Sequence, residues 1–356
     1  MFFYYTIWLV ISLFSFFFNK KKEIKIIFFL MIAFLTFMTG LRYEVGADWY
    51  NYLAIYDQFK YLDFSSALLV TDTGYGLFNY ISNRLGLTEI FLVNTLCSIC
   101  FFICFYYFST KFENYWLPLL ISFPYLILVV SMGYTRQAVA ISFVLMAIVY
   151  GLENNFKKHF FFVFLAFLFH KSAIIVFMFS PFFIFPNFFR NNFIFFCYVV
   201  FSFLFMSYVV YLSSSLTDNI YTEKSGDMSS AGAIFRISFH FFPMAFFLFY
   251  RKKIKIIFKS NYHFFDYMAF LIFFSLMLAI PFSTLADRFN LYLIVFDIFI
   301  FSCLYSKLNY LDRQFMVGSI IILNTIMLII WFNFGAWSHA WIPYQNYFFN
   351  FILESV

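Results

Sequence analysis

The chain has 356 residues, of which 64% are hydrophobic and only 11% are charged. Soluble domains average about 25% charged residues, so a soluble fold could not keep this much apolar surface from water. The composition excludes a soluble enzyme, a nucleic-acid-binding domain and a disordered chain, and it predicts an all-α, polytopic integral membrane protein. The net charge of +6 does not indicate nucleic-acid binding, because the cations fall in short clusters between apolar runs.

About twelve apolar runs follow one another along the chain, most of them close to the roughly 17–25 residues that cross a bilayer. They lie near residues 2–18, 26–41, 90–108, 115–132, 136–152, 160–170, 172–186, 193–211, 234–250, 264–281, 289–306 and 315–332. The sixth and seventh runs are short, so this stretch forms two short spans, one long broken helix or a re-entrant hairpin. A break in a spanning helix is tolerated only where the chain lines a protein cavity.

The distribution of basic residues predicts the direction of these runs. When the cluster at residues 20–25 is placed in the cytoplasm and the runs alternate, most of the 23 Lys and Arg residues fall in cytoplasmic loops. The outer side holds the remainder: Arg42, Lys60, Arg84, Arg136, Lys171, Lys224, Arg236 and Arg288. This bias predicts a single transmembrane domain over residues 1–356 with both termini outside.

Two outer loops are long. In the larger, residues 42–89, the side chains of Trp49, Tyr52 and Tyr56 recur at helical spacing, which predicts short amphipathic helices on the outer membrane boundary. Residues 212–233 are rich in Ser, Thr and Gly and form the second loop. We find no internal repeat and no separate soluble domain.

Three cysteines, Cys97, Cys100 and Cys104, fall within one apolar run. The C-x-x-C spacing fits either a metal or redox pair or small packing residues on a helix face. We favour packing, because no second pair and no nearby His cluster accompany it. We therefore expect no metal.

Arginine dominates the cations of the outer side. Arg42, Arg136, Arg236 and Arg288 each lie at or beside the mouth of a predicted span. Charges at a membrane boundary often mark a site, and the planar guanidinium can bind phosphate through two hydrogen bonds. The arginines therefore suit a lipid-linked pyrophosphate; the alternative is that single side chains extend to lipid headgroups.

The local sequences around these residues form recognisable motifs. The first is LRYEVGADWYNY, an R-x3-G-x-D-x3-Y pattern in which Gly46 permits a tight turn, so that Arg42 and Asp48 can face one site. Further along the chain come GYTRQAVAISF with Arg136, FHKSA with His170, ADRFNLY with Arg288, and WIPYQNY with Tyr344.

This ordered set resembles the EpsG-like family of exopolysaccharide and O-antigen (Wzy-type) polymerases. The segment from Asp72 to Tyr75 is similar to the acid-x-G-Tyr segment of that family, with Asp where Glu is expected. An Arg before an Ala-rich span, Phe-His-x-Ser, and a later Arg with a nearby Tyr follow in the same order. The matches run from about residue 42 to 345, nearly the whole chain.

The resemblance implies a GT-C-like glycosyltransferase architecture in the bacterial inner membrane, with the active site facing the periplasm. The donor would be a growing glycan on undecaprenyl pyrophosphate, and the acceptor would be the terminal sugar of a lipid-linked repeat unit. The implied partners are this lipid-linked oligosaccharide, membrane lipid and a protein that regulates chain length. No cofactor, nucleotide sugar or nucleic acid is implied.

Roles for individual residues follow from this reaction. We predict that Arg136 and Arg288 bind pyrophosphate, and that either Asp48 or His170 takes the acceptor proton. A carboxylate beside Arg has a lowered pKa and is a poorer base, so Asp48 could instead orient Arg42. The predicted substrate-binding residues are Arg42, Gly46, Tyr52, Asp72, Tyr75, Arg84, Arg236, Tyr292 and Tyr344.

Three other membrane functions fit parts of the pattern. A flippase for lipid-linked oligosaccharide should show two similar halves and charges along a central path, whereas these charges crowd at one face. A membrane acyltransferase should show a paired His and acid, whereas the five His residues are scattered. A lipid-linked glycan ligase shares the donor and stays an alternative.

A reporter enzyme that is active only in the periplasm tests the topology. Fused after Asp63 or Ser225 it should be active, and fused after Lys22 or Lys255 it should be silent, because the bias of basic residues places these positions on opposite sides. The reverse pattern would move every arginine motif to the cytoplasm and contradict the site assignment.

Overall fold

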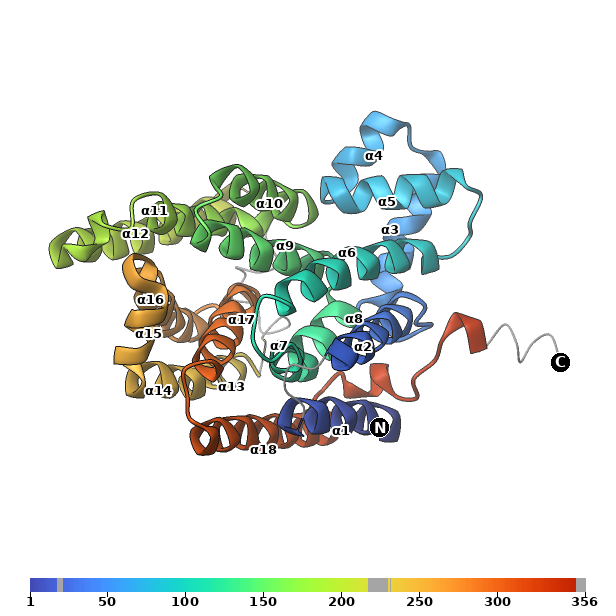
Figure 1. Cartoon of the computed structure of the whole chain (residues 1–356). Coiled ribbons are helices and arrows are strands. Elements are labelled where there is room, and N and C mark those ends of the chain that lie inside the picture. Colours follow the sequence, from blue (N-terminus) through green and yellow to red (C-terminus); the bar gives the residue numbers. More distant parts are fainter. Residues whose placement is uncertain (18–21, 217–229, 231, 350–356) are drawn as a thin grey trace. The chain divides into compact units, whose positions relative to one another are not determined.

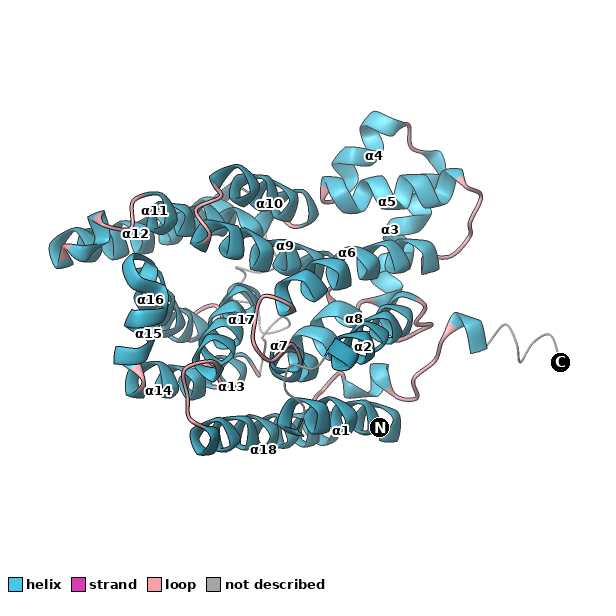
Figure 2. Ribbon diagram, in the orientation of Figure 1, coloured by secondary structure: helices cyan, strands magenta, loops and turns pink. Residues whose placement is uncertain are grey.

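The computed structural model describes residues 1–17, 22–216, 230 and 232–349. Most of these residues are helical, and short loops join the helices (Figure 2). Within this part of the chain, the backbone pairing of β type is one isolated antiparallel bridge between Arg42 and Asn346. The all-α prediction is therefore confirmed.

Among the described residues, six helices are long and apolar enough to cross a membrane. They are Phe91–Ser109, Trp116–Gly133, Thr135–Leu152, Arg251–Ala279, Ser283–Tyr305 and Tyr310–Phe334. Shorter apolar helices cover Phe2–Phe17, Lys25–Gly40, Lys171–Ile184, Asn192–Tyr208 and Ala233–Phe249. The chain is thus a membrane protein with several spans, whereas the number twelve and the GT-C-like architecture stay predictions.

The helical form of these runs follows from their surroundings. A hydrocarbon layer offers no hydrogen-bond partner, so backbone groups must be satisfied within the segment, and a helix does this. Each apolar run expected from the sequence coincides with a helical segment, including the broken stretch: α10 (Phe156–Phe169) ends before His170, and a 3-10 helix, η3 (Lys171–Phe179), follows.

The chain divides into two compact units. Unit 1 comprises residues 1–147, 158–174 and 308–356. Its elements are α1 (Phe2–Phe17), α2 (Lys22–Gly40), α3 (Trp49–Gln58), η1 (Phe59–Tyr61), α4 (Phe64–Val70), α5 (Thr73–Arg84), α6 (Phe91–Ser109), α7 (Trp116–Ser122), η2 (Phe123–Val130), α8 (Ser131–Gly133), most of α9 (Thr135–Leu152) and of α10, α18 (Tyr310–Phe334) and η7 (Ser338–Trp341). The first and last long helices of the chain, α1 and α18, lie side by side (Figure 1).

Unit 2 comprises residues 148–157 and 175–307. Its elements are α11 (Ser180–Ile184), η4 (Phe188–Arg190), α12 (Asn192–Leu216), α13 (Ala233–Ser238), α14 (Phe241–Phe249), α15 (Arg251–Phe258), η6 (Lys259–Asn261), α16 (Tyr262–Ala279) and α17 (Ser283–Tyr305). Helix α17 packs against both α13 and α16 and is the buried centre of this unit. Of the predicted loop 212–233, residues 212–216 end α12, and 217–229 and 231 lie outside the described residues.

A π-helical segment in unit 1 is hydrogen-bonded to the C-terminal part of the chain. Proline at position 124 lacks the N–H of a regular helix, and residues 123–130 adopt the wider π form, which often occurs at functional sites. The indole N–H of Trp341 donates to the carbonyl of Leu128 at 2.8 Å, and the hydroxyl of Tyr4 donates to the carbonyl of Trp341 at 2.9 Å. Trp341 thereby ties α1 to the π segment.

The turn after α2 depends on Gly46. Its φ of +113° is a backbone conformation that other residues rarely adopt, and a Cβ there would lie 2.3 Å from the carbonyl oxygen of Met132. The N–H of Gly46 donates to the carbonyl of Ala340 at 2.9 Å. Only glycine therefore lets the turn sit between the end of α8 and the C-terminal segment.

Gly46→Ala should lower the thermal unfolding midpoint and the yield of folded protein. The strained backbone alone costs about 1–2 kcal/mol, and the contact with Met132 adds to this cost. Thermal unfolding of detergent-purified protein is the measurement. Gly86→Ala is the matched control, because Gly86 also has a positive φ of +75° but nothing lies within 4 Å of its Cβ position. Equal losses in the two variants would contradict the role given to the close approach.

Candidate functional site

Three charged or titratable side chains meet in unit 1 around the carboxylate of Asp72. Asp72 immediately precedes α5, Arg136 is the second residue of α9, and His170 lies between α10 and η3. Each residue therefore stands at or beside the end of a helix. Residues far apart in sequence form one compact polar group.

The carboxylate of Asp72 binds its neighbours rather than its own helix. It stands at the N-cap of α5 but makes no side-chain cap hydrogen bond. Instead, Oδ2 accepts from Nη1 of Arg136 at 2.8 Å, and Oδ1 accepts from the backbone N–H of Lys171 at 3.1 Å. Only 6% of its side chain is exposed, so this carboxylate is held in place from both sides.

Gly74 makes this arrangement possible. A Cβ on Gly74 would lie 2.7 Å from the ring of Phe169, the last residue of α10. Because Gly74 has no side chain, the first turn of α5 can approach the end of α10. That approach brings Asp72 to the residue that follows, His170.

His170 lies against the same carboxylate. Its Nδ1 is 3.5 Å from Oδ2 of Asp72, which is an ion-pair distance rather than a hydrogen bond. This nitrogen is buried, whereas 26% of the side chain is exposed, so the exposed surface belongs to other atoms of the side chain. The geometry directs one edge of the imidazole toward Asp72 and leaves another edge accessible.

Arg136 is bound on one side and open on another. Its Nη1 donates to Thr71 Oγ1 and to Asp72 Oδ2, both at 2.8 Å. The guanidinium carbon lies 5.9 Å from the centre of the Tyr52 ring and 5.8 Å from that of Tyr75, within the range of cation–π attraction. The side chain keeps 29% of its surface exposed, so Arg136 is fixed by these contacts but not enclosed.

The electrostatics keep Asp72 ionised. Burial raises the pKa of this carboxyl, but His170, the positive charge of Arg136 and the N–H of Lys171 together outweigh burial and hold the pKa below its usual value of 3.8. Asp72 is therefore a poor proton acceptor. It is suited to fix its cationic and imidazole neighbours.

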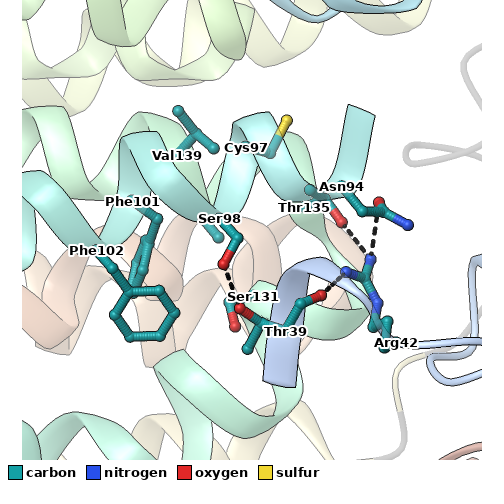
Figure 3. Close-up of a pocket in the computed structure, with 11 residues that line it drawn as sticks. Thr39, Arg42, Asn94, Cys97, Ser98, Phe101, Phe102, Ser131, Thr135 and Val139 are labelled. Carbon is teal, nitrogen blue, oxygen red and sulfur yellow. Dashed lines mark hydrogen bonds between the residues drawn. The ribbon is translucent and has the colours of Figure 1, made fainter. Parts of the chain in front are cut away.

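Arg42 is bound by a different set of neighbours, and Figure 3 shows its hydrogen bonds to Thr39, Asn94 and Thr135. Its exposure is 1%, and its guanidinium donates to four oxygens within the protein. These are the carbonyls of Val45 (3.2 Å) and Thr39, the side-chain carbonyl of Asn94 (3.2 Å) and the hydroxyl of Thr135 (2.9 Å). No carboxylate is among these acceptors.

The cavity beside Arg42 is too small for a phosphate. It is lined by Thr39, Arg42, Asn94, Cys97, Ser98, Phe101, Phe102, Ser131, Thr135, Ala138 and Val139 (Figure 3). The space open to the centre of a water molecule is about 10 Å³, which is room for a single water. The hydrogen bond from Arg42 to Thr135 ties this guanidinium to the start of α9.

The other residues predicted from the first motif lie apart from Asp72. The side chain of Asp48 accepts from Asn51 at 3.3 Å and shares no hydrogen bond or ion pair with Arg42 in the part of the chain described. The expected Arg42–Asp48 pair is therefore not formed, because the guanidinium turns inward to neutral oxygens. Arg84 donates to the carbonyl of Leu62 at 2.7 Å and lies over the ring of Tyr80.

Tyr344 belongs to the C-terminal segment. Its hydroxyl donates to the carbonyl of Met38 at 2.9 Å and accepts from Asn346 at 2.8 Å. Burial raises the pKa of Tyr344 to about 12, so the phenol stays protonated at any physiological pH. These contacts hold the segment against the end of α2.

The remaining predicted residues belong to unit 2. Arg236 makes a two-point ion pair with Asp287, with both N–O distances at 2.7 Å, and thus already has a carboxylate. Arg288 and Tyr292 lie in α17, and their roles stay predictions. Asp297 also lies in α17, and its Oδ2 is 2.7 Å from Nδ1 of His240, the residue directly before α14.

Among the residues that the structure describes, no group of three or more His, Cys, Asp or Glu side chains could hold a metal ion. The polar group around Asp72 contains one carboxylate and one imidazole together with a guanidinium. A cation would have to displace Arg136 to reach this carboxylate. The arrangement favours binding an anion next to Arg136.

Comparison with known families identifies this chain. The family model described as the EpsG family matches residues 25–346. The chain belongs to the EpsG family. The match takes in unit 2 and most of unit 1, with Asp72, Arg136 and His170, so this EpsG protein is a membrane protein of the polysaccharide-polymerase type. No curated protein and no solved structure matches the chain.

The sequence had indicated Asp72 only as a substrate-binding residue of this EpsG protein. Its contacts with Arg136 and Lys171 join positions 64 and 99 residues apart, and no local pattern predicts them. The available signal was Gly74, whose place in the acid-x-G-Tyr segment indicates a close approach. The partner in that approach, Phe169, could be identified only from the fold.

Asp72→Asn tests whether the negative charge stabilises this group. The folded-state pKa is lowered, so the carboxylate contributes in full above its ordinary pKa of 3.8, and the contribution is lost as the pH falls through the folded-state pKa. We expect the variant to lose about 1.5–3 kcal/mol of unfolding free energy at neutral pH, and the difference from the parent to shrink below pH 3.8. Unfolding at pH 7 and pH 3 measures this.

Asp48→Asn is the matched control for this experiment. Asp48 lies in the same segment between α2 and α6, and its carboxylate accepts a hydrogen bond from Asn51, so replacing it with an amide should cost little at either pH. A loss for Asp72→Asn that is the same at pH 7 and pH 3 would mean that the charge of the carboxylate is not the source of the stability.

Proposed function

We propose that this chain is an exopolysaccharide or O-antigen polymerase of the bacterial inner membrane. It would transfer a growing glycan from undecaprenyl pyrophosphate onto the terminal sugar of a lipid-linked repeat unit at the periplasmic face. Membership of the EpsG family supports the class of reaction. The donor, the acceptor and the side of the membrane are the parts that we propose.

The observation that carries the proposal is that one buried carboxylate holds both a guanidinium and an imidazole. Arg136 and His170 each contact Asp72 and each keep about a quarter of their side chain exposed, 29% and 26%. Glycosyl transfer from a pyrophosphate requires a positive charge at the leaving group and a base at the acceptor hydroxyl. Arg136 and His170 supply these two functions side by side.

In the proposed step, the acceptor oxygen forms a bond to the anomeric carbon while the bond from that carbon to the pyrophosphate oxygen breaks. The electron pair of the broken bond leaves with undecaprenyl pyrophosphate, next to the guanidinium of Arg136. The acceptor proton passes to Nε2 of His170. The proton is later released to water, which restores the neutral imidazole.

Asp72 makes His170 a suitable base. A carboxylate facing Nδ1 favours the tautomer that carries its proton on that nitrogen and leaves the lone pair on Nε2. Asp72 also balances the charge of the imidazolium formed in the step. Because Asp48 contacts neither Arg136 nor His170 through an ion pair or a hydrogen bond in the described part of the chain, we favour His170 over Asp48 as the base.

Arg42 would act through position rather than by contact with substrate. It donates to the hydroxyl of Thr135, the residue directly before Arg136, and to the carbonyl of Thr39 at the end of α2. These bonds fix where α9 begins. Loss of Arg42 should therefore displace the Arg136 side chain as well as destabilise the fold.

Arg136→Ala should reduce chain extension by about 10²–10³-fold, the usual loss for one charge-stabilising donor. Arg136→Lys should recover only part of the rate, because an ammonium cannot donate two parallel hydrogen bonds. The measurement is chain extension in vesicles with purified lipid-linked repeats, corrected for the amount of inserted protein. Arg313→Ala is the matched control, since Arg313 also forms a partly exposed ion pair, with Glu113 at 3.5 Å.

His170→Gln should cost about 10²–10⁴-fold in the same assay, because the amide keeps a polar side chain but cannot accept the proton. Asp48→Asn should lose less than about tenfold. The opposite ranking would assign the base to Asp48, and two mild losses would mean that the reaction rests on Arg136 and on substrate placement.

The size of the glycan after gene deletion tests the reaction class itself. A polymerase deletion should collapse the ladder of chain lengths on a gel to a single repeat, because repeats are still made and exported but are not joined. Loss of every repeat would instead indicate a flippase or a ligase and would overturn the proposed function.

A further inference from the structure

The short helix α15 (Arg251–Phe258) carries an unusual concentration of positive charge. Its sequence, RKKIKIIF, and the residue after it supply five cations: Arg251, Lys252, Lys253, Lys255 and Lys259. It lies between two apolar helices of unit 2, α14 and α16. A cationic link between two apolar helices lies where those helices reach the membrane surface.

One face of α15 is fixed to the protein. Ile254 is fully buried and Phe258 is 8% exposed, and these residues are one turn apart. The ring of Phe258 packs against that of Phe265, with centroids 3.9 Å apart. The helix therefore cannot rotate, and its opposite face has a defined composition.

That opposite face combines two lysines with an exposed isoleucine. At 100° per residue, Lys252, Ile256 and Lys253 lie on the side away from Ile254. Ile256 is 70% exposed, although it is among the most apolar of residues. Lys252 and Lys253 precede Ile256 by four and three residues, so both ammonium groups flank it on the helix surface.

Carboxylates in the described part of the chain neutralise little of this charge. Among the described residues, Asp266 is the carboxylate that pairs with this segment, and it binds Arg251 at 3.1 Å and also lies near His263. Lys253 lies over the ring of Tyr250 and Lys255 over that of Tyr262, which are aromatic rather than acidic partners. The other four cations pair with no carboxylate among the residues that the structure describes.

We propose that α15 binds anionic phospholipid. Lys252 and Lys253 contact the phosphate groups of the leaflet at which α14 and α16 meet, and Ile256 enters the layer just below those groups. At a membrane interface, a helix face of this kind places its apolar side chain below the headgroups and its lysines among the phosphates. Attraction of about 1 kcal/mol per cation corresponds to about fivefold local enrichment of anionic lipid.

A tryptophan at position 256 reports which lipids surround it. The full-length Ile256→Trp protein is placed in nanodiscs that contain phosphatidylcholine with a minority of phosphatidylglycerol. Two samples are compared, one with brominated phosphatidylcholine and one with brominated phosphatidylglycerol. Bromine quenches the fluorescence of a nearby tryptophan. The signal of the parent protein is subtracted. We expect brominated phosphatidylglycerol to quench about fivefold more than its bulk fraction predicts.

Two further variants make the result specific. When Lys252→Gln and Lys253→Gln are added to the Ile256→Trp protein, quenching by brominated phosphatidylglycerol should fall toward the value that its bulk fraction predicts. Leu204→Trp is the matched control, because Leu204 is 60% exposed on the apolar helix α12 and should report bulk lipid. Bulk-proportional quenching with the lysines intact, or no quenching by either lipid, would overturn the proposal. Neither result depends on glycosyl transfer.

Discussion

The buried guanidinium of Arg42 constrains the arrangement of unit 1. An uncompensated charge inside a protein costs several kcal/mol, so each of its donors needs a well-placed acceptor. The structure provides these acceptors from the end of α2, the turn before Gly46, helix α6 and the start of α9. Four segments meet because one cation has to be satisfied. The position of α9, and with it the position of Arg136, follows from that requirement.

The helices could be predicted well from the sequence, because hydropathy and length are local properties. An interruption between the runs 160–170 and 172–186 was expected from their short lengths, and a tight turn at Gly46 from the conformational freedom of glycine; the structure has both. The partners of Asp72 were not predictable, since its two hydrogen-bonded neighbours lie 64 and 99 residues away. Such contacts depend on how the apolar helices pack, which a hydropathy pattern does not encode.

Arginines that look equivalent in sequence have different environments in the fold. Arg42 is enclosed by neutral oxygens, Arg236 is matched by Asp287, and Arg136 shares Asp72 with a histidine while part of it stays exposed. All three stand at the mouth of an apolar run, so position and residue type alone could not separate them. Burial sets Arg42 apart from the other two. Arg136 and Arg236 are similarly exposed, at 29% and 25%, and each pairs with an aspartate. What distinguishes Arg136 is that its aspartate also faces His170.

The C-terminal segment has a consequence for how the protein is made. Leu41 and Tyr43 exchange backbone hydrogen bonds with Tyr347 and Gln345, and Gly46 is held by Ala340. A chain grows from its N-terminus, so the residues around Arg42 are synthesised early and their backbone partners last. The turn beside the start of α9 can close only after α18 has been inserted. A chain that stalls late in translation would carry nearly all of its helices but lack the backbone partners of Leu41, Tyr43 and Gly46.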